Sequence, residues 1–152
     1  MTNEERQARS GIAVGKPVQA SSNLREGGAT SPEAAVDGRT NSRWSSEFSD
    51  PQWIAVDLGS AEKISRVVLD WEAAFAKTYA VEVSLDGEVW KEVYQTQNGH
   101  SGSQEIELPS VEARWIRMRG TQRGTPFGYS LWEFRVFREK AGAVQDKSKT
   151  QM

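Results

Sequence analysis

The chain has 152 residues, 37% of them apolar, with a formal net charge of −2. This length suits one domain with one substantial core, and the slightly acidic balance argues against a nucleic-acid binder, whose basic face would dominate the total charge. The absence of cysteine excludes disulfides, thiolate catalysis and cysteine-ligated zinc, and no apolar run reaches the roughly 18 residues that a membrane-spanning helix needs.

Both ends of the chain are polar and lack hydrophobic periodicity. We therefore expect flexible flanks over residues 1–14 and 140–152, with one folded domain over residues 15–139. The first seven residues contain no apolar core of the kind that a secretory signal requires. The protein is thus expected to be cytoplasmic if the chain is complete, or an excised module of a secreted bacterial protein.

Residues 35–44 form an oxygen-rich stretch that ends at an aromatic residue, Trp44. Asp37 offers a carboxylate, Gly38 permits the positive φ of a tight turn, and residues 40–42 add three oxygen-bearing side chains. Hard cations such as Ca²⁺ take six to eight oxygen ligands, so this composition suits a calcium loop with Trp44 buried beneath it. The alternative, which these residues leave open, is an Asp-Gly turn in which Asp37 caps its own backbone.

Alternating apolar and polar residues predict strands over most of the remaining chain. A strong hairpin turn is expected at Asp86 and Gly87, and one helical turn at residues 31–35, with Ser31 as its cap and Pro32 at its first position. Seven or eight short strands at this spacing indicate a sandwich or a barrel. The strands are predicted at residues 54–59, 64–71, 79–84, 90–94, 104–108, 115–119 and 131–137.

Few residues are suited to catalysis. The single histidine, His100, lies in a polar loop without a histidine or cysteine partner, so we interpret it as a solvated side chain. A small glycosidase that uses two carboxylates remains an alternative. Nothing in the sequence brings the candidate acids together, which are Glu26, Glu47, Asp50 and Glu72.

Aromatic residues supply the better binding candidates. We expect about four of the six tryptophans in the core, as is usual in sandwiches. Phe48 and Phe127 instead lie in polar loops, where an exposed ring stacks on the apolar face of a sugar while charged neighbours hydrogen-bond its hydroxyls. The alternative is that each ring packs under its own loop.

Five motifs occur in order between Gly15 and Phe137: Gly15-Lys16-Pro17 with Ala20-Ser21-Ser22; Ala35-Val36-Asp37-Gly38 through Ser42-Arg43-Trp44; Gln52-Trp53-Ile54 with Asp57-Leu58-Gly59; Ser84 with Asp86-Gly87 and Trp90; and Gly128-Tyr129-Ser130-Leu131-Trp132-Glu133-Phe134. Together they resemble the discoidin or coagulation factor five/eight type C fold, and more closely carbohydrate-binding module family 32. The resemblance implies an all-β, jelly-roll β-sandwich of about eight strands, with a structural calcium and a sugar site on loops at one end.

The same resemblance implies roles for particular residues. The calcium ligands would be the side chains of Asp37, Ser42 and Glu133, with backbone carbonyls near Ala34 and Arg39. Serine at position 42 replaces the usual threonine and keeps the oxygen. Modules attached to enzymes that act on chitosan and β-glucans are the most similar in residues 71–74 and 128–133. The ligand-binding positions carried over from them, with the loop aromatics, are Glu26, Arg43, Phe48, Glu72, Phe127 and Tyr129.

We therefore predict a non-catalytic carbohydrate-binding module for a β-linked glycan, either chitosan or glucosamine oligomers or a β-glucan. Two glutamates beside the site, Glu26 and Glu72, disfavour anionic sugars and favour an ammonium, whereas Arg43 opposes an ammonium unless an acid pairs with it. We expect a monomer that binds neither nucleic acid nor membranes, with a parent glycoside hydrolase as a possible covalent partner. A protein- or cell-surface-interaction discoidin domain is the alternative from another class.

Overall fold

The computed structural model describes residues 11–24 and 30–139 of the chain. This part contains antiparallel strands and a single 3₁₀ turn, η2 (Pro32–Ala35). The strands are β1 (Val18–Ala20), β2 (Trp44–Ser45), β3 (Gln52–Trp71), β4 (Ala76–Ser84), β5 (Lys91–Thr96), β6 (Gly102–Arg123) and β7 (Ser130–Arg138). The predicted all-β class is confirmed.

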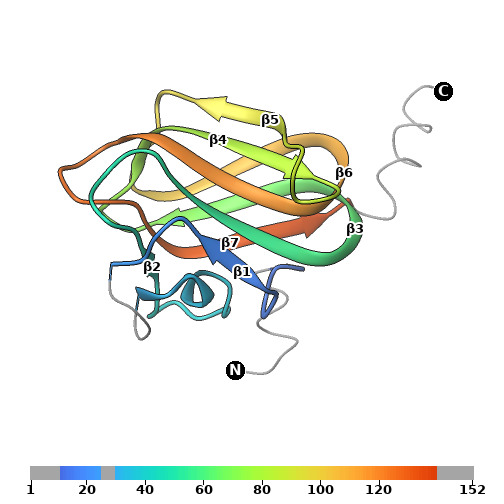
Figure 1. Ribbon diagram of the computed structural model, residues 1–152, viewed down its shortest axis with the longest axis horizontal. Coiled ribbons are helices and arrows are strands. Elements are labelled where there is room, and N and C mark those ends of the chain that lie inside the picture. Colours follow the sequence, from blue (N-terminus) through green and yellow to red (C-terminus); the bar gives the residue numbers. More distant parts are fainter. Residues whose placement is uncertain (1–10, 25–29, 140–152) are drawn as a thin grey trace.

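Two long strands, β3 and β6, give the molecule its two layers. The pairing between β3 and β6 shifts its register between Asp57 and Glu62 of β3. Gly59, in this interval, adopts a φ of 90°, which glycine reaches without a steric penalty. Before this bend β3 pairs with β1 and with the second half of β6, and after it β3 pairs with β7 and with the first half of β6. Figure 1 shows the two long ribbons curving through the molecule, with the β4–β5 hairpin at one side.

The core lies between these two layers. Along β3 the residues at positions 54, 56 and 58 are buried on one side of the bend, and those at positions 67, 69 and 71 are buried on the other. This period of two is the pattern of a strand with one face in the core, and the side chains between these positions lie on the opposite face, where Ala55 and Val68 are also buried and the others are partly buried. Phe134 of β7 and Met118 of β6 are completely buried in the same cluster. The alternation that predicted the strands therefore also marks the face of each strand that enters the core.

The predicted strands differ from the observed ones mainly in length. Those at residues 54–59 and 64–71 are one continuous strand, β3, and those at residues 104–108 and 115–119 are both part of β6. Each apparent break is a largely exposed stretch within one strand: the exposed positions of β3 all lie within residues 59–63, and three of the four residues at 109–112 of β6 are exposed. The seven predicted strands therefore correspond to five observed ones, and the short strands β1 and β2, which were not predicted, bring the described residues to seven.

The prediction of four buried tryptophans is wrong. Trp44 and Trp71 are buried, as their positions suggested, but the other four are only partly buried. Trp53 and Trp115 alternate with core residues, so they lie on the outer face of their strands. Trp90 covers a surface arginine, since the Arg117 guanidinium lies 4.0 Å from its ring centre.

Two local predictions at the start of the domain also need correction. Residues 11–14 were assigned to a flexible flank, but the Ile12 amide donates to the Val136 carbonyl at 2.9 Å and Ala13 is completely buried. The predicted turn at Pro32 is present, whereas the Ser31 side chain makes no capping hydrogen bond. The backbone carbonyl of Ser31 accepts from the Ala34 amide instead, at 3.1 Å. Residues 1–10 and 140–152 lie outside the described residues.

Over residues 11–24 and 30–139, no helix has the length and apolarity needed to cross a bilayer. The loops that follow β2, β3 and β6, at residues 46–51, 72–75 and 124–129, converge on the start of β7. The Ser46 amide donates to the Tyr129 carbonyl, while the Glu72 amide donates to the Ser130 carbonyl. These bonds place three loops at one end of the sandwich.

Gly120 of β6 has no room for a side chain, because an added Cβ would lie 2.2 Å from the ring of Tyr129. We expect Gly120→Ala to lower the free energy of unfolding by about 1 to 3 kcal/mol, as overpacking of a close-packed interior does. Thr121→Ala, at the exposed next position of the same strand, is the control and should change it by no more than about 0.5 kcal/mol. Urea unfolding of both variants measures the difference, and equal stabilities would contradict this packing argument.

Candidate functional site

The three converging loops enclose a cleft of about 250 Å³ at one end of the sandwich. Small residues make up much of its floor, and larger aromatic and charged side chains stand around it. The lining residues are Leu24, Arg43, Ser45, Ser46, Phe48, Glu72, Ala73, Ala74, Phe127, Gly128, Tyr129 and Ser130. Five of the six residues predicted as ligand-binding are in this set; the sixth, Glu26, lies outside the described residues.

Backbone hydrogen bonds fix the cleft floor. The Ser46 hydroxyl accepts from the Tyr129 amide at 2.8 Å and donates to the Glu47 carbonyl at 2.8 Å. On the other side, the Ser130 amide donates to the Ala74 carbonyl, also at 2.8 Å. Gly128 is required between them, because a Cβ there would lie 2.6 Å from oxygens of Ser46 and Glu47. The floor is therefore as rigid as the adjoining strands.

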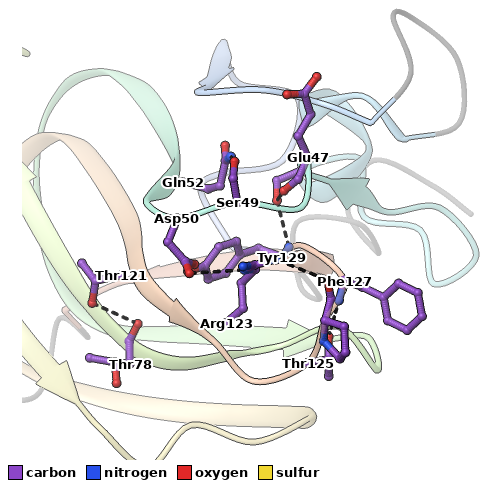
Figure 2. Close-up of polar contacts among 12 residues, drawn as sticks. Glu47, Ser49, Asp50, Gln52, Thr78, Thr121, Arg123, Thr125, Phe127 and Tyr129 are labelled. Atoms are coloured by element: carbon purple, nitrogen blue, oxygen red, sulfur yellow. Dashed lines mark hydrogen bonds and ion pairs between the residues drawn. The ribbon is translucent and has the colours of Figure 1, made fainter.

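Two exposed rings stand at the rim of the cleft. Phe48 is 50% exposed and Phe127 is 57% exposed, so neither packs beneath its own loop. Their ring centres lie 5.6 Å apart with an interplanar angle of 82°, the edge-to-face arrangement that aromatic pairs prefer. In Figure 2 the Phe127 ring points away from the polar groups behind it. Two apolar surfaces are thus held together in contact with water.

Arg43 and Glu72 bring opposite charges to the cleft. The Arg43 Nε donates to the Ser45 hydroxyl at 3.2 Å, and its guanidinium carbon lies 5.5 Å from the ring centre of Trp132. Glu72 uses Oε1 to accept from the Ala74 amide at 3.1 Å. Within the described part of the chain, no carboxylate forms an ion pair with Arg43. Both side chains are half-buried, so each is oriented but still accessible to a ligand.

Tyr129 lines the cleft without exposing its side chain. The residue is completely buried and its hydroxyl donates a very short hydrogen bond to Asp50 Oδ1. Burial, with the neighbouring Asp50 carboxylate, raises the pKa of the Tyr129 phenol well above its ordinary value. The phenol therefore remains a neutral donor, and the structure places it beneath the cleft as a support, not on the surface that a ligand would reach.

Leu24, Asp50 and Arg123 take part in the site although sequence reasoning did not assign them to it. Leu24 is 42% exposed and stands in the cleft wall, where its amide donates to the Ser45 carbonyl at 2.7 Å. An isolated leucine among polar residues was its only signal. Asp50 was considered only as a glycosidase acid, but both of its oxygens accept hydrogen bonds, from Tyr129 and from Arg123. An ion pair between residues 73 positions apart has no signature in a single sequence.

The predicted side-chain calcium ligands lie in or against the loop of residues 37–42, at a second place outside the cleft. Asp37 Oδ2 accepts from the Ser42 hydroxyl at 2.5 Å, and Glu133 Oε1 accepts from the Gly38 amide at 3.0 Å. Gly38 has a φ of 73°, as expected for this turn. The Arg39 amide donates to Asp37 Oδ1 at 2.9 Å, so the capping interaction considered as the alternative is also present.

This donor set fits a hard cation in its chemistry. It consists of two carboxylates and a hydroxyl, and Glu133 is only 2% exposed on β7. A buried carboxylate is unfavourable unless hydrogen bonds or a cation compensate its charge. No cluster of three or more acidic, histidine or cysteine side chains suitable for a metal occurs within the described ranges, so any remaining ligands would be hydroxyl and backbone oxygens. Trp44 is completely buried next to the loop, as predicted, and its Nε1 donates to the Ser22 carbonyl.

His100 is exposed, and its Nδ1 lies 2.8 Å from the Ser101 carbonyl oxygen. This placement agrees with its interpretation as a solvated loop side chain.

Several solved structures that are similar to this chain are carbohydrate-binding modules. Chitosan-binding module 1 of a chitosanase/glucanase from Paenibacillus sp. IK-5 is 44% identical, with a TM-score of 0.79 over 85% of this chain and 98% of that one. Module 2 of the same enzyme, solved with chitotriose, is 39% identical, with a TM-score of 0.78 over 83% of this chain and 98% of that one. The CBM32 of AlyQ, in complex with 4,5-unsaturated mannuronic acid, is 25% identical, with a TM-score of 0.67 over 81% of this chain and 95% of that one.

A curated relative is much longer than this chain. The polysaccharide lyase 8 family protein HylA of Enterococcus faecalis is 36% identical over 88 residues, which are 56% of this chain and 6% of HylA. The F5/8 type C domain family matches residues 17–134, which include every strand except the end of β7. The resemblance identified in the sequence is confirmed, and the chain belongs to the F5/8 type C domain family.

Proposed function

We propose that this domain is a non-catalytic carbohydrate-binding module whose ligand occupies the cleft between Phe48, Phe127, Arg43 and Glu72. The observation that carries the proposal is the pair of exposed rings beside two oriented, oppositely charged side chains. Rings of this kind stack on the apolar face of a pyranose, and the charged groups hydrogen-bond its hydroxyls or amine.

Similarity to the two Paenibacillus modules supports this proposal, since they are chitosan-binding and match this chain over nearly their whole length. A glycosidase, which needs a pair of carboxyl groups, is disfavoured, because Glu72 is the only acidic residue among the described residues that line the cleft and both carboxylate oxygens of nearby Asp50 accept hydrogen bonds. General acid-base chemistry requires a carboxyl group that is free to exchange a proton with the substrate.

The ligand that fits best is a β-linked glycan, with chitosan or glucosamine oligomers preferred to a neutral β-glucan. Glu72 attracts an ammonium group through its accessible carboxylate. The positive charge of Arg43 is not compensated by a carboxylate of the described residues, because its contacts there are a hydroxyl and an aromatic ring. An ammonium would therefore bind at the Glu72 side, while sugar hydroxyls accept from Arg43.

We expect Phe48→Ala and Phe127→Ala to weaken binding of chitosan oligomers by about 1 to 3 kcal/mol each, or roughly five- to a hundredfold in Kd. Both rings are at least half exposed, so the midpoint of thermal unfolding should change little. Isothermal titration calorimetry and thermal melts check the two effects on the same samples. The matched control is Val89→Ala, which removes a 75% exposed apolar side chain outside the cleft.

The absence of binding to every oligomer of a panel that contains chitosan, β-glucan and β-galactoside oligomers would contradict the carbohydrate-binding proposal. Release of reducing ends from any of them would indicate the glycosidase alternative. Binding to a protein or cell surface without binding to the panel would indicate an interaction domain.

The charge on Glu72 predicts how the affinity depends on salt. Raising the ionic strength from about 0.05 to 0.5 M should weaken binding of chitosan oligomers several-fold, because screening reduces the attraction between carboxylate and ammonium. Neutral β-glucan oligomers should show almost no change, since stacking and neutral hydrogen bonds are little screened. Glu72→Gln should remove most of the salt dependence for chitosan. A salt dependence of the same size in Glu72→Gln would exclude this carboxylate as the ammonium partner.

We also propose a structural Ca²⁺ held by Asp37, Ser42 and Glu133, with carbonyls near Ala34 and Arg39. The support is the meeting of two carboxylates and a hydroxyl at one turn. The ion would offset the charge of the buried Glu133 and link β7 to the loop that precedes β2. Its effect on the sugar would be indirect, through the position of this loop.

Calcium binding to the native state alone predicts higher stability when calcium is added. At about 100 times the dissociation constant, the free energy of unfolding should rise by about 2.7 kcal/mol, and a chelator should reverse the change. Thermal melts with calcium and with chelator measure this effect. Asp37→Asn should melt at the same temperature in both, whereas Asp57→Asn, at a carboxylate paired with Arg114 outside the loop, should keep the calcium response. An unchanged wild-type midpoint, with no metal in elemental analysis, would contradict the site.

We infer that the domain acts outside the cell as part of a larger protein that degrades glycans. The support is that the similar modules derive from a chitosanase/glucanase and that the matched region is a small part of HylA. In such a protein the module would raise the local concentration of the catalytic domain on its substrate.

A further inference from the structure

The two rings at the cleft rim come from different loops, and a polar bridge joins these loops behind them. Phe48 lies in the loop after β2, and Phe127 lies in the loop between β6 and β7. Asp50 is two residues beyond Phe48. Its carboxylate Oδ2 accepts from Arg123 Nε at 3.2 Å, and its Oδ1 accepts from the Tyr129 hydroxyl. Figure 2 shows Asp50, Arg123 and Tyr129 meeting behind the Phe127 loop; we call these three residues the Asp50 bridge.

Arg123 connects the bridge to the loop that carries Phe127. Its Nη1 donates to the Pro126 carbonyl at 3.2 Å, one residue before the ring. The Thr125 hydroxyl accepts from the Phe127 amide at 3.1 Å, so this loop also closes on itself. One guanidinium therefore holds the Phe127 loop with one nitrogen and the Phe48 loop with another.

Tyr129 connects the bridge to the core. Its ring is completely buried and packs against Gly120 in β6, so closely that a Cβ on Gly120 would lie 2.2 Å from it. Burial and the Asp50 carboxylate raise the pKa of the Tyr129 phenol, which favours the protonated form that donates to Asp50. Asp50 is thus anchored, through Tyr129, to strand β6 and not only to another loop.

A second set of contacts secures the segment before β3. Gln52 Nε2 donates to the Ser49 hydroxyl at 2.9 Å, and Gln52 Oε1 accepts from the Ser22 hydroxyl at 2.7 Å. The Glu47 amide donates to the same Ser22 hydroxyl at 3.0 Å. These contacts hold both sides of Phe48, but none of them reaches the loop of Phe127. The two ring-bearing loops are also joined by the hydrogen bonds between Ser46 and the backbone of Tyr129. The Asp50 bridge adds an ionic connection between side chains, which among the described residues links these two loops.

We propose that Asp50 is a positioning residue, which acts through Arg123 and Tyr129 to hold Phe48 and Phe127 at the 5.6 Å edge-to-face separation that a sugar meets. This inference rests on the proposed carbohydrate-binding function. An aromatic pair fixed before binding loses less conformational freedom when the ligand arrives, so the bridge raises affinity without touching the sugar.

Because the Asp50–Arg123 ion pair is partly exposed, its effect on ligand binding can be distinguished from its effect on stability. The side chains of Arg123 and Asp50 are 27% and 32% exposed, and ion pairs at such sites contribute about 0 to 1 kcal/mol to stability. Removing the charge from Asp50 should therefore change the melting temperature by only about 4 °C or less. A larger effect on binding than on stability is the signature of positioning.

The primary variant is Asp50→Asn. The asparagine carbonyl still accepts from Tyr129, but the charge that attracts Arg123 is gone, so one arm of the bridge is broken and the other is kept. We expect Kd for chitosan oligomers, measured by calorimetry, to rise about five- to tenfold. A change of this size corresponds to the coupling free energy that is typical of side chains in contact. Arg123→Gln should have a similar effect, and the double variant should bind no more weakly than either single variant, because all three lack the same ion pair.

Asp57→Asn is the matched control. Asp57 forms a comparable pair with Arg114, at 2.9 Å between Asp57 Oδ1 and Arg114 Nε, and lies at the β3 bend rather than in the cleft. Its affinity for the oligomer should remain within about twofold of wild type. A readout that needs no ligand is the nuclear Overhauser effect between the rings of Phe48 and Phe127, which should weaken in Asp50→Asn and persist in Asp57→Asn.

An unchanged ring-to-ring signal in Asp50→Asn, or an affinity equal to that of wild type, would overturn the proposal. So would fully additive losses in the double variant. If wild-type protein binds no glycan of the panel, the proposed function fails, but the ring-to-ring signal still tests the bridge by itself. If Asp50→Asn melts far below wild type, Tyr129→Phe, which removes only the hydroxyl arm, provides the second variant. A persistent ring-to-ring signal in that variant would also overturn the proposal.

Discussion

The hydrogen bonds that flank the start of β7 are the constraint on which the whole cleft depends. Tyr129 bonds through its amide and its carbonyl to Ser46 on one side, while Ser130 bonds through the same two groups to Ala74 and Glu72 on the other. Two loops that are far apart in sequence are thereby joined to one short segment. Because Gly128 has no Cβ, the loop at Ser46 can approach within contact distance of its backbone. The loops that carry Phe48, Glu72 and Phe127 are all connected to this segment.

Much of the fold could be predicted from the sequence because period-two alternation reports the face of a strand directly. The alternation at residues 54–58 and 115–119 corresponds to the core-facing and outward-facing sides of β3 and β6, although Ala55 on the outward side is also buried. The continuity of each strand through its bend could not be predicted. Gly59 and Pro109 are typical of loops, and only long-range pairing between β3 and β6 carries the strands past these positions. The outward-facing tryptophans were misassigned for a related reason, since hydrophobicity alone does not distinguish the two faces of a sheet.

The candidate site was predictable in its surface members and not in its supports. Exposed Phe48 and Phe127 stood out as aromatic residues among polar neighbours, and the resemblance supplied Arg43 and Glu72. Each of these reaches the same cleft. Tyr129 was predicted to contact the ligand, because the sequence does not show that this tyrosine next to a strand is buried. Whether a side chain is a support or a contact depends on which strand it faces, and that relation exists only after folding.

The cleft and the oxygen-rich loop are mechanically connected, although they lie at different places. Arg43 directly precedes Trp44, which pairs with Leu131 of β7, and Glu133 lies two residues further along that strand. The Gly38 amide bonds to Glu133, so the turn that holds Asp37 is fixed to the strand that forms the cleft floor. Any group that neutralises Glu133 would stiffen the segment from Asp37 to Trp44, and with it the backbone of Arg43. The Arg43 side chain is held in turn by its Nε bond to the Ser45 hydroxyl and by the Trp132 ring, whose centre lies 5.5 Å from the guanidinium carbon, so backbone and side-chain contacts together place its charge at the cleft.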